Sequence, residues 1–448
     1  MVSVYRRYWV RILPLIDTLW VLLLAFYVLA GVHQVPFHGD ESTTIWMSKD
    51  FAYLVTGDID RLRYTDPPVD PAEQHLRLIT GSLTKYLIGL SWAMNGYEVS
   101  EINEQWHWGF DWDWNQANGH APGDELLMLG RWPSALMLAI SVGVLFRVAS
   151  LVGGRPVAYI ASFLYALNPA VLLNGRRAMF EGGLLLFVLL VVLSGLVWAR
   201  YGRWRLVFAF GIACGLAISA KHTAASSVAV LFITGVGFRL WMYRTAWRQT
   251  LSQALVIVLL AVGIFLLLNP IWWGNPIGRV SQVLDARIGI LNDQVDLFGG
   301  YGGFADQLHG FWRQTFVVNP QYYEVSDWAG FIGNQIGVYE ASIWRGPDLS
   351  TPFVVVLLHA VLVVLGGAAL VIWRARPLSV RLGFGLWSVT MFLTAALLTP
   401  LEWQRYYLLN YPATAVLSAI GIVFLLQTFL RFRASSKRVG HTEVMPQS

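Results

Sequence analysis

Residues 179–198 read MFEGGLLLFVLLVVLSGLVW, and Glu181 is the only charged side chain among them. A helix needs about 20 mainly apolar residues to cross roughly 30 Å of hydrocarbon, so this run predicts a membrane-spanning helix. Similar runs recur along the 448-residue chain, which is 56% hydrophobic and 13% charged. A soluble domain carries about 25% charge. The composition therefore excludes a soluble protein.

Ten apolar runs have a length that fits a membrane span. They cover residues 13–35, 130–151, 156–173, 179–198, 206–220, 223–241, 251–272, 351–373, 382–399 and 408–430. An eleventh run, 78–94, is shorter, contains two glycines and carries Lys85 near its middle, which is typical of an interfacial or re-entrant helix. The sequence thus predicts an all-α polytopic membrane protein with about ten transmembrane helices.

The basic residues orient these spans. With ten spans, both termini and the short basic loops face one side, which receives more than half of the 32 basic residues and one acid, Glu443. Basic loops favour the cytoplasmic side. We therefore expect a multi-pass protein of a bacterial or archaeal plasma membrane, with one membrane domain over 1–430 and a basic cytoplasmic tail at 431–448. Because the charge lies in these loops, the pI of 9.2 predicts no nucleic-acid partner.

Two long segments, 36–129 and 273–350, then lie outside. The first is the large extracytoplasmic first loop, and it holds more than half of the chain's 27 acids. We therefore expect the chemistry on the outside. The N-terminal apolar stretch is longer than the 7 to 15 residues typical of a signal peptide, so it predicts an uncleaved first span. Cys214 is the only cysteine, which excludes an intrachain disulfide and predicts a small core residue.

An acidic pair, Asp40 and Glu41, follows the first span directly. Asp40 and Ser42 both suit the N-cap of a helix, which is the simpler interpretation. A carboxylate at the mouth of an apolar cavity can instead serve as a general base for an acceptor hydroxyl. The dipeptide alone leaves both interpretations open.

Several cations lie at the outer ends of spans. Snorkelling to the interface is the ordinary explanation for any one of them. Their convergence on the outer mouth favours a second interpretation, a clamp for a phosphate or pyrophosphate, because Arg offers bidentate contacts to such groups. The residues concerned are Arg131, Arg176, Arg177, Lys221, His222 and Arg405.

The first outer loop also contains four tryptophans among nine residues. Interfacial aromatics often form only a membrane belt, but flat aromatic faces beside carboxylate and amide acceptors also suit sugar binding. In an extended strand, Trp106, Trp108, Trp112 and Trp114 would share one face. We expect such a strand to bind the acceptor. The spacing of the nearby histidines matches no metal motif, so no metal site is predicted.

The order of these motifs resembles glycosyltransferase family 39, a group of GT-C enzymes that includes protein O-mannosyltransferases and lipid A aminoarabinose transferases. The resemblance covers most of residues 13–430. The motifs that carry it are His38-Gly39-Asp40-Glu41, Thr84-Lys85-Tyr86-Leu87, Gly130-Arg131-Trp132-Pro133, Leu167-Asn168-Pro169, Arg176-Arg177-Ala178-Met179, Lys221-His222-Thr223 and Arg405-Tyr406-Tyr407.

This resemblance implies a GT-C-like fold and transfer of a sugar from a polyprenyl-phosphate carrier in the bilayer to an extracytoplasmic glycan, lipid or protein. It implies no cofactor. By position, Asp40 matches the essential first-loop acid with Glu41 beside it, while Arg131, Lys221 and Arg405 match basic positions near the lipid phosphate. The alternative from another class is a transporter or flippase that holds an anionic or lipid-linked substrate with the same cations.

Overall fold

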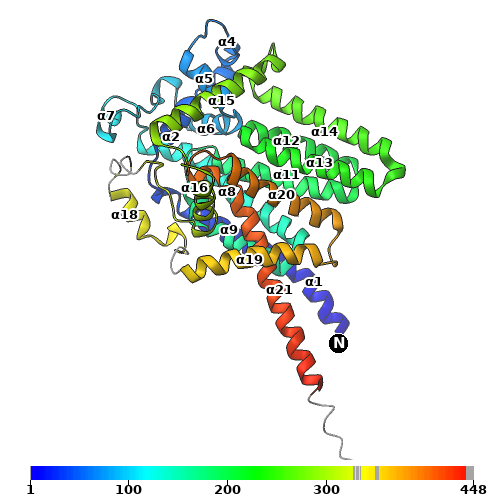
Figure 1. The fold of residues 1–448 in the computed structure, drawn as a ribbon. Coiled ribbons are helices and arrows are strands. Elements are labelled where there is room, and N and C mark those ends of the chain that lie inside the picture. Colours follow the sequence, from blue (N-terminus) through cyan, green and yellow to red (C-terminus); the bar gives the residue numbers. More distant parts are fainter. Residues whose placement is uncertain (1, 326–327, 329–331, 333, 349–352, 440–448) are drawn as a thin grey trace, which may run out of the picture.

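The computed structural model describes residues 2–325, 328, 332, 334–348 and 353–439, with side chains from residue 12 to residue 433 inside these ranges. All regular elements in this part of the chain are helices, and it contains no strand (Figure 1). The predicted all-α class is therefore confirmed.

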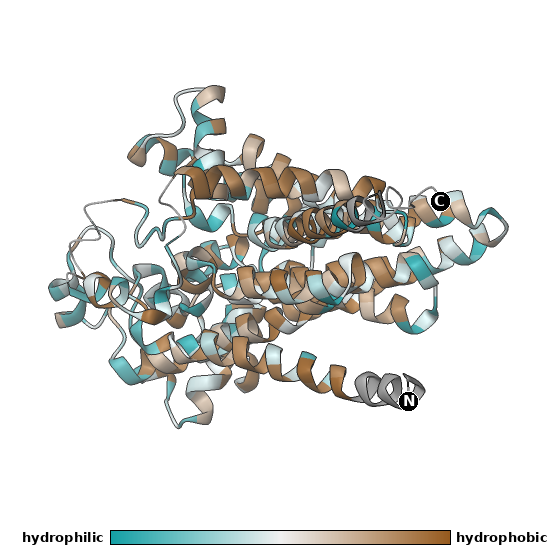
Figure 2. Ribbon diagram, turned by 90° about the horizontal axis from the view of Figure 1, so that it is seen from below, coloured by the Kyte–Doolittle hydropathy of each residue, from teal (hydrophilic) through white to brown (hydrophobic). Residues whose placement is uncertain are grey.

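Eight helices are long and apolar enough to cross a membrane. They lie in α1 (Val2–Ala30), α8 (Asp124–Gly153), α11 (Glu181–Tyr201), α13 (Ala225–Met242), α14 (Trp247–Leu268), α19 (Phe353–Ile372), α20 (Leu378–Leu398) and α21 (Asn410–Val439). The chain is thus an integral multi-pass membrane protein. Figure 2 shows that the long helices are mainly hydrophobic, whereas hydrophilic residues gather at one end of the bundle.

Two further expected spans take other forms. The run 156–173 folds as α9 (Arg155–Ala166) and α10 (Pro169–Arg176), which meet at 61° and together pass as one broken span. The bend falls where Asn168 caps α10 and Pro169 occupies its first turn, a sequence that starts a new helix. The run 206–220 forms α12 (Trp204–Ala220), which is shorter than a full span. A total of ten crossings therefore stays a prediction.

The turn between α11 and α12 shows how closely these helices pack. Gly202 has a φ of +59°, a left-handed conformation that favours glycine. A Cβ there would come within 2.1 Å of the Arg239 guanidinium, so glycine also makes room for that side chain. The Gln253 side chain donates to the Gly202 carbonyl at 2.6 Å and thereby fixes the turn to α14. Cys214 is fully buried in the same core, as predicted.

Mostly short helices cover the end of the bundle opposite the turn between α11 and α12. The first outer segment forms α2 (Gly39–Met47), α3 (Asp50–Thr56), α4 (Ile59–Leu62), α5 (Pro71–Ile79), α6 (Leu83–Met94) and α7 (Trp112–Ala117). The second forms α15 (Pro276–Phe298), α16 (Phe304–Trp312), a π-helical turn (Arg313–Val317) and α18 (Asn334–Glu340). In Figure 1 most of the first group gathers beside α15, while α1 and α21 leave the bundle on the opposite side.

The eleventh run forms α6, which is not among the helices that could span a membrane. Its Lys85 does not snorkel to solvent, because the side chain is fully buried and its Nζ donates to Asp50 Oδ2 at 3.0 Å. Arg77 also donates to Asp50, at 2.7 Å, and to Glu73. Both cations hold the pKa of the Asp50 carboxyl below its usual value, although burial acts in the opposite direction. This ion cluster joins α3, α5 and α6.

We expect Asp50→Asn to destabilise the fold strongly, because it leaves two buried cations without their shared carboxylate. Breaking a buried pair in this way costs about 3–5 kcal/mol. The matched control is Asp60→Asn, since Asp60 pairs with Arg63 at the surface, where a pair contributes about 0–1 kcal/mol. Thermal unfolding of the two variants in detergent measures the difference. Equal unfolding temperatures would show that the cluster does not hold α3, α5 and α6 together.

Candidate active site

Two adjoining cavities lie at the end of the bundle covered by short helices. They share four lining residues, Lys221, Arg287, Arg405 and Tyr406. One cavity, of about 220 Å³, extends from these residues to Asp40. The other, of about 170 Å³, has mainly aliphatic walls, formed by Leu184, Leu291, Met391, Ala395, Leu398 and Leu409. The cations therefore lie at the junction between a polar and an apolar chamber.

Asp40 lies in the first turn of α2 with a partly exposed side chain. The N-cap of this helix is His38, whose Nδ1 accepts the backbone N–H of Asp40 at 3.1 Å. The N-cap role considered for Asp40 is therefore wrong, because the histidine two residues earlier takes that position. The Asp40 carboxylate lines the cavity and forms an ion pair with Arg405.

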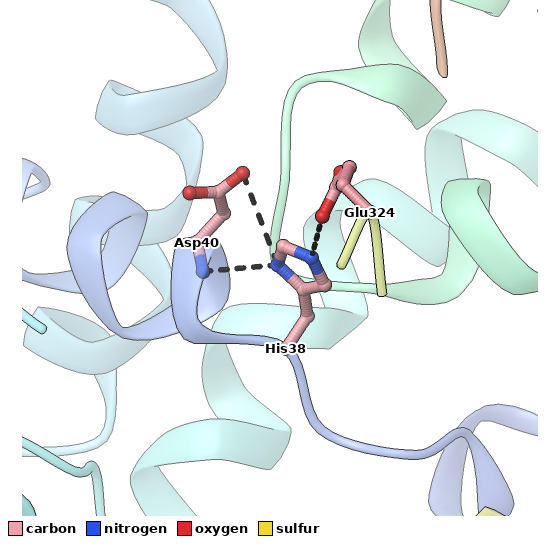
Figure 3. A group of neighbouring side chains, drawn as sticks. All are labelled: His38, Asp40 and Glu324. Carbon is pink, nitrogen blue, oxygen red and sulfur yellow. Dashed lines mark hydrogen bonds and ion pairs between the residues drawn. The ribbon is translucent and has the colours of Figure 1, made fainter. Parts of the chain in front are cut away.

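His38 connects Asp40 to a second carboxylate, as Figure 3 shows. Because Nδ1 of His38 accepts a backbone N–H, Nε2 carries the proton that is donated to Glu324 Oε2 at 2.8 Å. Arg405 also approaches Glu324, with 3.3 Å between Nε and Oε1. Burial raises the pKa of the Glu324 carboxyl, but Arg405 and His38 outweigh burial and hold it well below the usual range. The Arg405 guanidinium thus lies between two carboxylates.

His38, Asp40 and Glu324 come close enough together to hold a metal ion, a grouping that the sequence did not predict. Their donor atoms already have partners, however. Both carboxylates face Arg405, and both nitrogens of the imidazole are hydrogen-bonded. A metal ion at this position would compete with the Arg405 guanidinium for these two carboxylates.

Glu41 points away from the cavity into the protein. Its fully buried carboxylate accepts hydrogen bonds from Nε and Nη2 of Arg131 at 2.7 and 2.8 Å, and from the backbone N–H of Ala178 at 2.9 Å. Burial raises the pKa of Glu41, but Arg131 outweighs burial and lowers it overall. The pair joins α2 to α8 and to the turn before α11. Neither the Glu41 carboxylate nor Arg131 lines the two cavities, so catalysis and phosphate binding by these residues stay predictions without geometric support.

Arg176 and Arg177 are also used inside the protein. Arg176 donates to the backbone carbonyls of Val28, Tyr27 and Trp344 at 2.7, 2.8 and 2.5 Å. Arg177 donates to the carbonyls of Pro36 and Tyr322 at 3.2 and 2.9 Å. Both side chains are almost fully buried. The two arginines hold the segment that leads from α1 to Asp40 in place. Neither of them lines the two cavities, so their contact with a phosphate stays a prediction.

Lys221 and His222 lie between α12 and α13 and line the Asp40 cavity. Lys221 Nζ donates to Glu181 Oε1 at 2.6 Å. The other Glu181 oxygen and both His222 nitrogens are buried without a hydrogen-bond partner among the described residues. Buried polar groups normally have partners, so this part of the cavity is suited to polar groups of a ligand.

Arg287 and Glu324 are site residues that our sequence analysis did not find. Arg287 lies on α15 and forms no hydrogen bond or ion pair within the described part of the chain. Burial and the neighbouring Arg405 lower the pKa of its guanidinium. A signal was present, because Arg287, Ile290, Leu291 and Gln294 all line the cavities and have the i, i+3, i+4, i+7 spacing of one helix face. No comparable pattern surrounds Glu324.

The four tryptophans do not form a strand. Asp111 caps α7 by accepting the backbone N–H of Trp114 at 2.8 Å, so Trp112 and Trp114 are helical and the predicted shared strand face is wrong. Trp106 and Trp112 pack on Phe37, with ring centroids 5.3 and 4.7 Å away.

None of the four tryptophans lines the two cavities. Trp106 and Trp108 instead lie against Gly39, where a Cβ would clash with both rings. These two rings therefore support the backbone that carries Asp40. Binding of the acceptor by the tryptophans stays a prediction.

Part of the chain matches a known protein family. Residues 74–281 match the family model described as dolichyl-phosphate-mannose-protein mannosyltransferase. The resemblance stated from the sequence motifs is thereby confirmed. No curated protein sequence matches the chain significantly.

Several solved structures are similar at low identity. ArnT from Cupriavidus metallidurans bound to undecaprenyl phosphate has 14% identity and a TM-score of 0.47, over 91% of this chain and 59% of that one. The Archaeoglobus fulgidus oligosaccharyltransferase in complex with Zn and sulfate has 11% identity and a TM-score of 0.46, over 95% of this chain and 51% of that one. The Saccharomyces cerevisiae Pmt1–Pmt2 complex bound to the sugar donor has 16% identity and a TM-score of 0.39, over 56% of this chain and 33% of that one. The chain thus spans less than two thirds of each.

The buried Glu41 predicts a specific pH dependence. A carboxyl whose pKa is lower in the folded state adds stability above its unfolded pKa of about 4.5, and this stability is lost as the pH falls through the folded pKa. We therefore expect Glu41→Gln to lower the unfolding temperature at pH 7, and the gap to the wild type to shrink between about pH 5 and pH 3. Thermal unfolding in detergent across this range measures the gap.

The control is Glu104→Gln, because Glu104 is mostly exposed and pairs loosely with Lys49 at 3.5 Å. It should change the unfolding temperature little at any pH. A gap between Glu41→Gln and the wild type that stays constant down to pH 3 would contradict an ionised, paired Glu41.

Proposed function

We propose that this protein is a membrane glycosyltransferase that moves a sugar from a polyprenyl-phosphate donor to an acceptor hydroxyl on the outer side of the membrane. The single observation that carries the proposal is the junction of the two cavities, where Lys221, Arg287 and Arg405 separate an apolar chamber from the chamber that contains Asp40. A lipid-linked sugar phosphate has the same order of parts. The match to the mannosyltransferase family model supports this assignment.

The donor is placed with its phosphate at the three cations. Arg287 is the best-suited contact, because its guanidinium has no hydrogen-bond or ion-pair partner in the described structure and the residue lines both cavities. The first isoprene units would lie along the aliphatic wall formed by α11, α15 and α20. The sugar would then extend towards Asp40 and the unpartnered groups of Glu181 and His222. Charge and polarity thus orient the donor without any specific contact to the distant lipid tail.

Asp40 is proposed as the general base. Its carboxylate is paired with Arg405 before the donor binds. A phosphate at the junction offers Arg405 a second anion, and movement of the guanidinium towards it would free Asp40 to accept a proton. Donor binding would therefore switch on the base at the moment when it is needed.

The reaction is a single displacement. The acceptor oxygen gives its proton to Asp40 and forms a bond to the anomeric carbon, while the bond from that carbon to the phosphate oxygen breaks. The negative charge that develops on the leaving phosphate is stabilised by the cations already at the junction. Attack from the side opposite the phosphate inverts the anomeric configuration.

Other predicted site residues are assigned supporting roles. The Glu41–Arg131 pair and the Arg176 and Arg177 contacts to backbone carbonyls would hold the Asp40 backbone in place. The same proposal includes three statements: a sugar is the transferred group, the acceptor lies outside, and both termini lie in the cytoplasm. The transporter alternative uses the same cations, but the family match gives it no support.

The test separates the base from the phosphate contacts. Purified protein in nanodiscs is given polyprenyl-phosphate sugars and candidate acceptors, and mass spectrometry follows release of the polyprenyl phosphate. We expect Asp40→Asn to reduce turnover by about 10²–10⁴-fold, since loss of a general base acts on the chemical step, while donor binding is not weakened, because Arg405 loses a competing carboxylate. Arg287→Ala should weaken donor binding, and Arg287→Lys should restore it only in part, because a point charge cannot replace a bidentate contact.

Matched controls are Asp60→Asn and Arg63→Ala, which remove an exposed ion pair of the same segment and should change neither quantity. Full turnover in Asp40→Asn would refute the proposed base. Unchanged donor affinity in Arg287→Ala would refute the phosphate position. Movement of an intact lipid-linked sugar across the membrane, with no sugar transferred, would favour the transporter.

A further inference from the structure

A second large recess lies at the opposite end of the bundle from Asp40. It is a groove of about 710 Å³ between α8, α11 and α12, and its lining includes Arg147, Arg200 and Arg376. On α8, Arg147 follows Arg131 by 16 residues, which corresponds to about 24 Å at 1.5 Å per residue. On α11, Arg200 follows Glu181 by 19 residues, which corresponds to about 28 Å. The groove is therefore separate from the candidate active site.

The groove exists because α6 is short. At the active-site end, α6 fills the space between α8 and α12: Ser91 Oγ donates to the Leu129 carbonyl of α8 at 2.8 Å. Gly81, just before α6, lies so close to the end of α12 that a Cβ would come within 2.3 Å of the Ser219 carbonyl oxygen. With 12 residues, α6 is about 18 Å long, whereas the 30 residues of α8 extend for about 45 Å. The rest of the space between α8 and α12 stays open.

The walls of the groove are mainly apolar. Leu190, Leu193 and Val197 line it from α11, and Leu206 and Leu216 line it from α12. From residue 190 to residue 200, α11 rises by about 15 Å. The small side chains of Ala209 and Ala213 hollow out the α12 side. A hydrocarbon chain that lies along α11 would fit this apolar path.

Three cations from three separate segments line the same groove. Arg147 comes from α8, Arg200 from α11 and Arg376 from the turn between α19 and α20. No carboxylate belongs to the lining, and none of the three guanidiniums forms a hydrogen bond or an ion pair with the residues that the structure describes. Arg376 is packed against Gly154, where a Cβ would lie 2.3 Å from its Nη2. Its position is thus set by the turn between α8 and α9.

We propose that this groove binds an anionic glycerophospholipid, with the phosphate held by Arg147, Arg200 and Arg376 and one acyl chain along α11. Arginine gives bidentate contacts to phosphate oxygens, and basic pockets between transmembrane helices bind acidic headgroups. Independent snorkelling explains single cations that extend into water, but it does not require three of them to line one apolar groove. The proposal does not depend on the transferase activity.

The test counts lipids that stay bound to the purified full-length protein. The protein is reconstituted in nanodiscs of phosphatidylcholine with a minor share of phosphatidylglycerol and is then examined by native mass spectrometry. We expect the wild type to retain phosphatidylglycerol selectively. Retention should fall about tenfold or more in the triple variant Arg147→Ala, Arg200→Ala, Arg376→Ala. A tenfold loss of affinity corresponds to only about 1.4 kcal/mol of binding free energy. Ala209→Trp, which fills the groove but keeps the arginines, should also reduce it.

The control removes three exposed arginines outside the groove, with Arg205→Ala, Arg244→Ala and Arg248→Ala. It should retain the lipid, and the triple Arg→Lys variant of the groove should retain an intermediate amount. Equal loss in the control, or no selective retention by the wild type, would overturn the proposal. A parallel arm offers undecaprenyl phosphate. Preferential retention of that lipid in the groove would overturn the assignment to a glycerophospholipid.

Discussion

The position of Asp40 depends on the buried pair between Glu41 and Arg131. Two hydrogen bonds of 2.7 and 2.8 Å join α2 to α8, and the Ala178 N–H adds a third contact from the turn before α11. Because a side chain and its neighbour on a helix point in different directions, fixing Glu41 towards the core turns Asp40 towards the cavity. A buried charge pair is a costly way to stabilise a fold, but here it sets the direction of a reactive group at the membrane surface.

The second constraint is the partition of charge around the cavities. Burial opposes the charge of Arg405, but Glu324 and Asp40 outweigh burial and raise its pKa well above the usual value. Arg287 has no such carboxylate and is held near Arg405, so an anion at the junction would relieve the repulsion between these two cations. The same arrangement keeps Asp40 paired in the absence of an anion. The acidic and basic residues therefore act as one unit, in which binding of a phosphate changes the partner of the base.

The sequence predicts well what depends on composition and on position along a span. Lys221 and Arg405 were predicted because cations at span ends stand out, and the structure brings both to the Asp40 cavity. The sequence does not predict which residues that are distant along the chain will pair. Nothing local indicates that Arg131 would meet Glu41 rather than a phosphate, or that Arg176 would bind backbone carbonyls. Arg287 and Glu324 come from the second outer segment, where the helix-face spacing around Arg287 is a weak signal and no pattern surrounds Glu324. The alternate spacing of the tryptophans favours a strand, but the Asp111 carboxylate caps a helix there, and this local hydrogen bond decides the conformation of Trp112.

The most direct measurement of the central claim is a cryo-electron microscopy structure with a non-transferable polyprenyl-phosphate sugar analogue. The account predicts a phosphate within about 2.7–3.2 Å of at least two of the three cations at the junction, Lys221, Arg287 and Arg405. It also predicts that Arg405 has moved from Asp40 to the phosphate, and that the sugar lies beside Asp40. A phosphate bound away from these three residues, or an Arg405 that still pairs with Asp40 while the donor is bound, would contradict it.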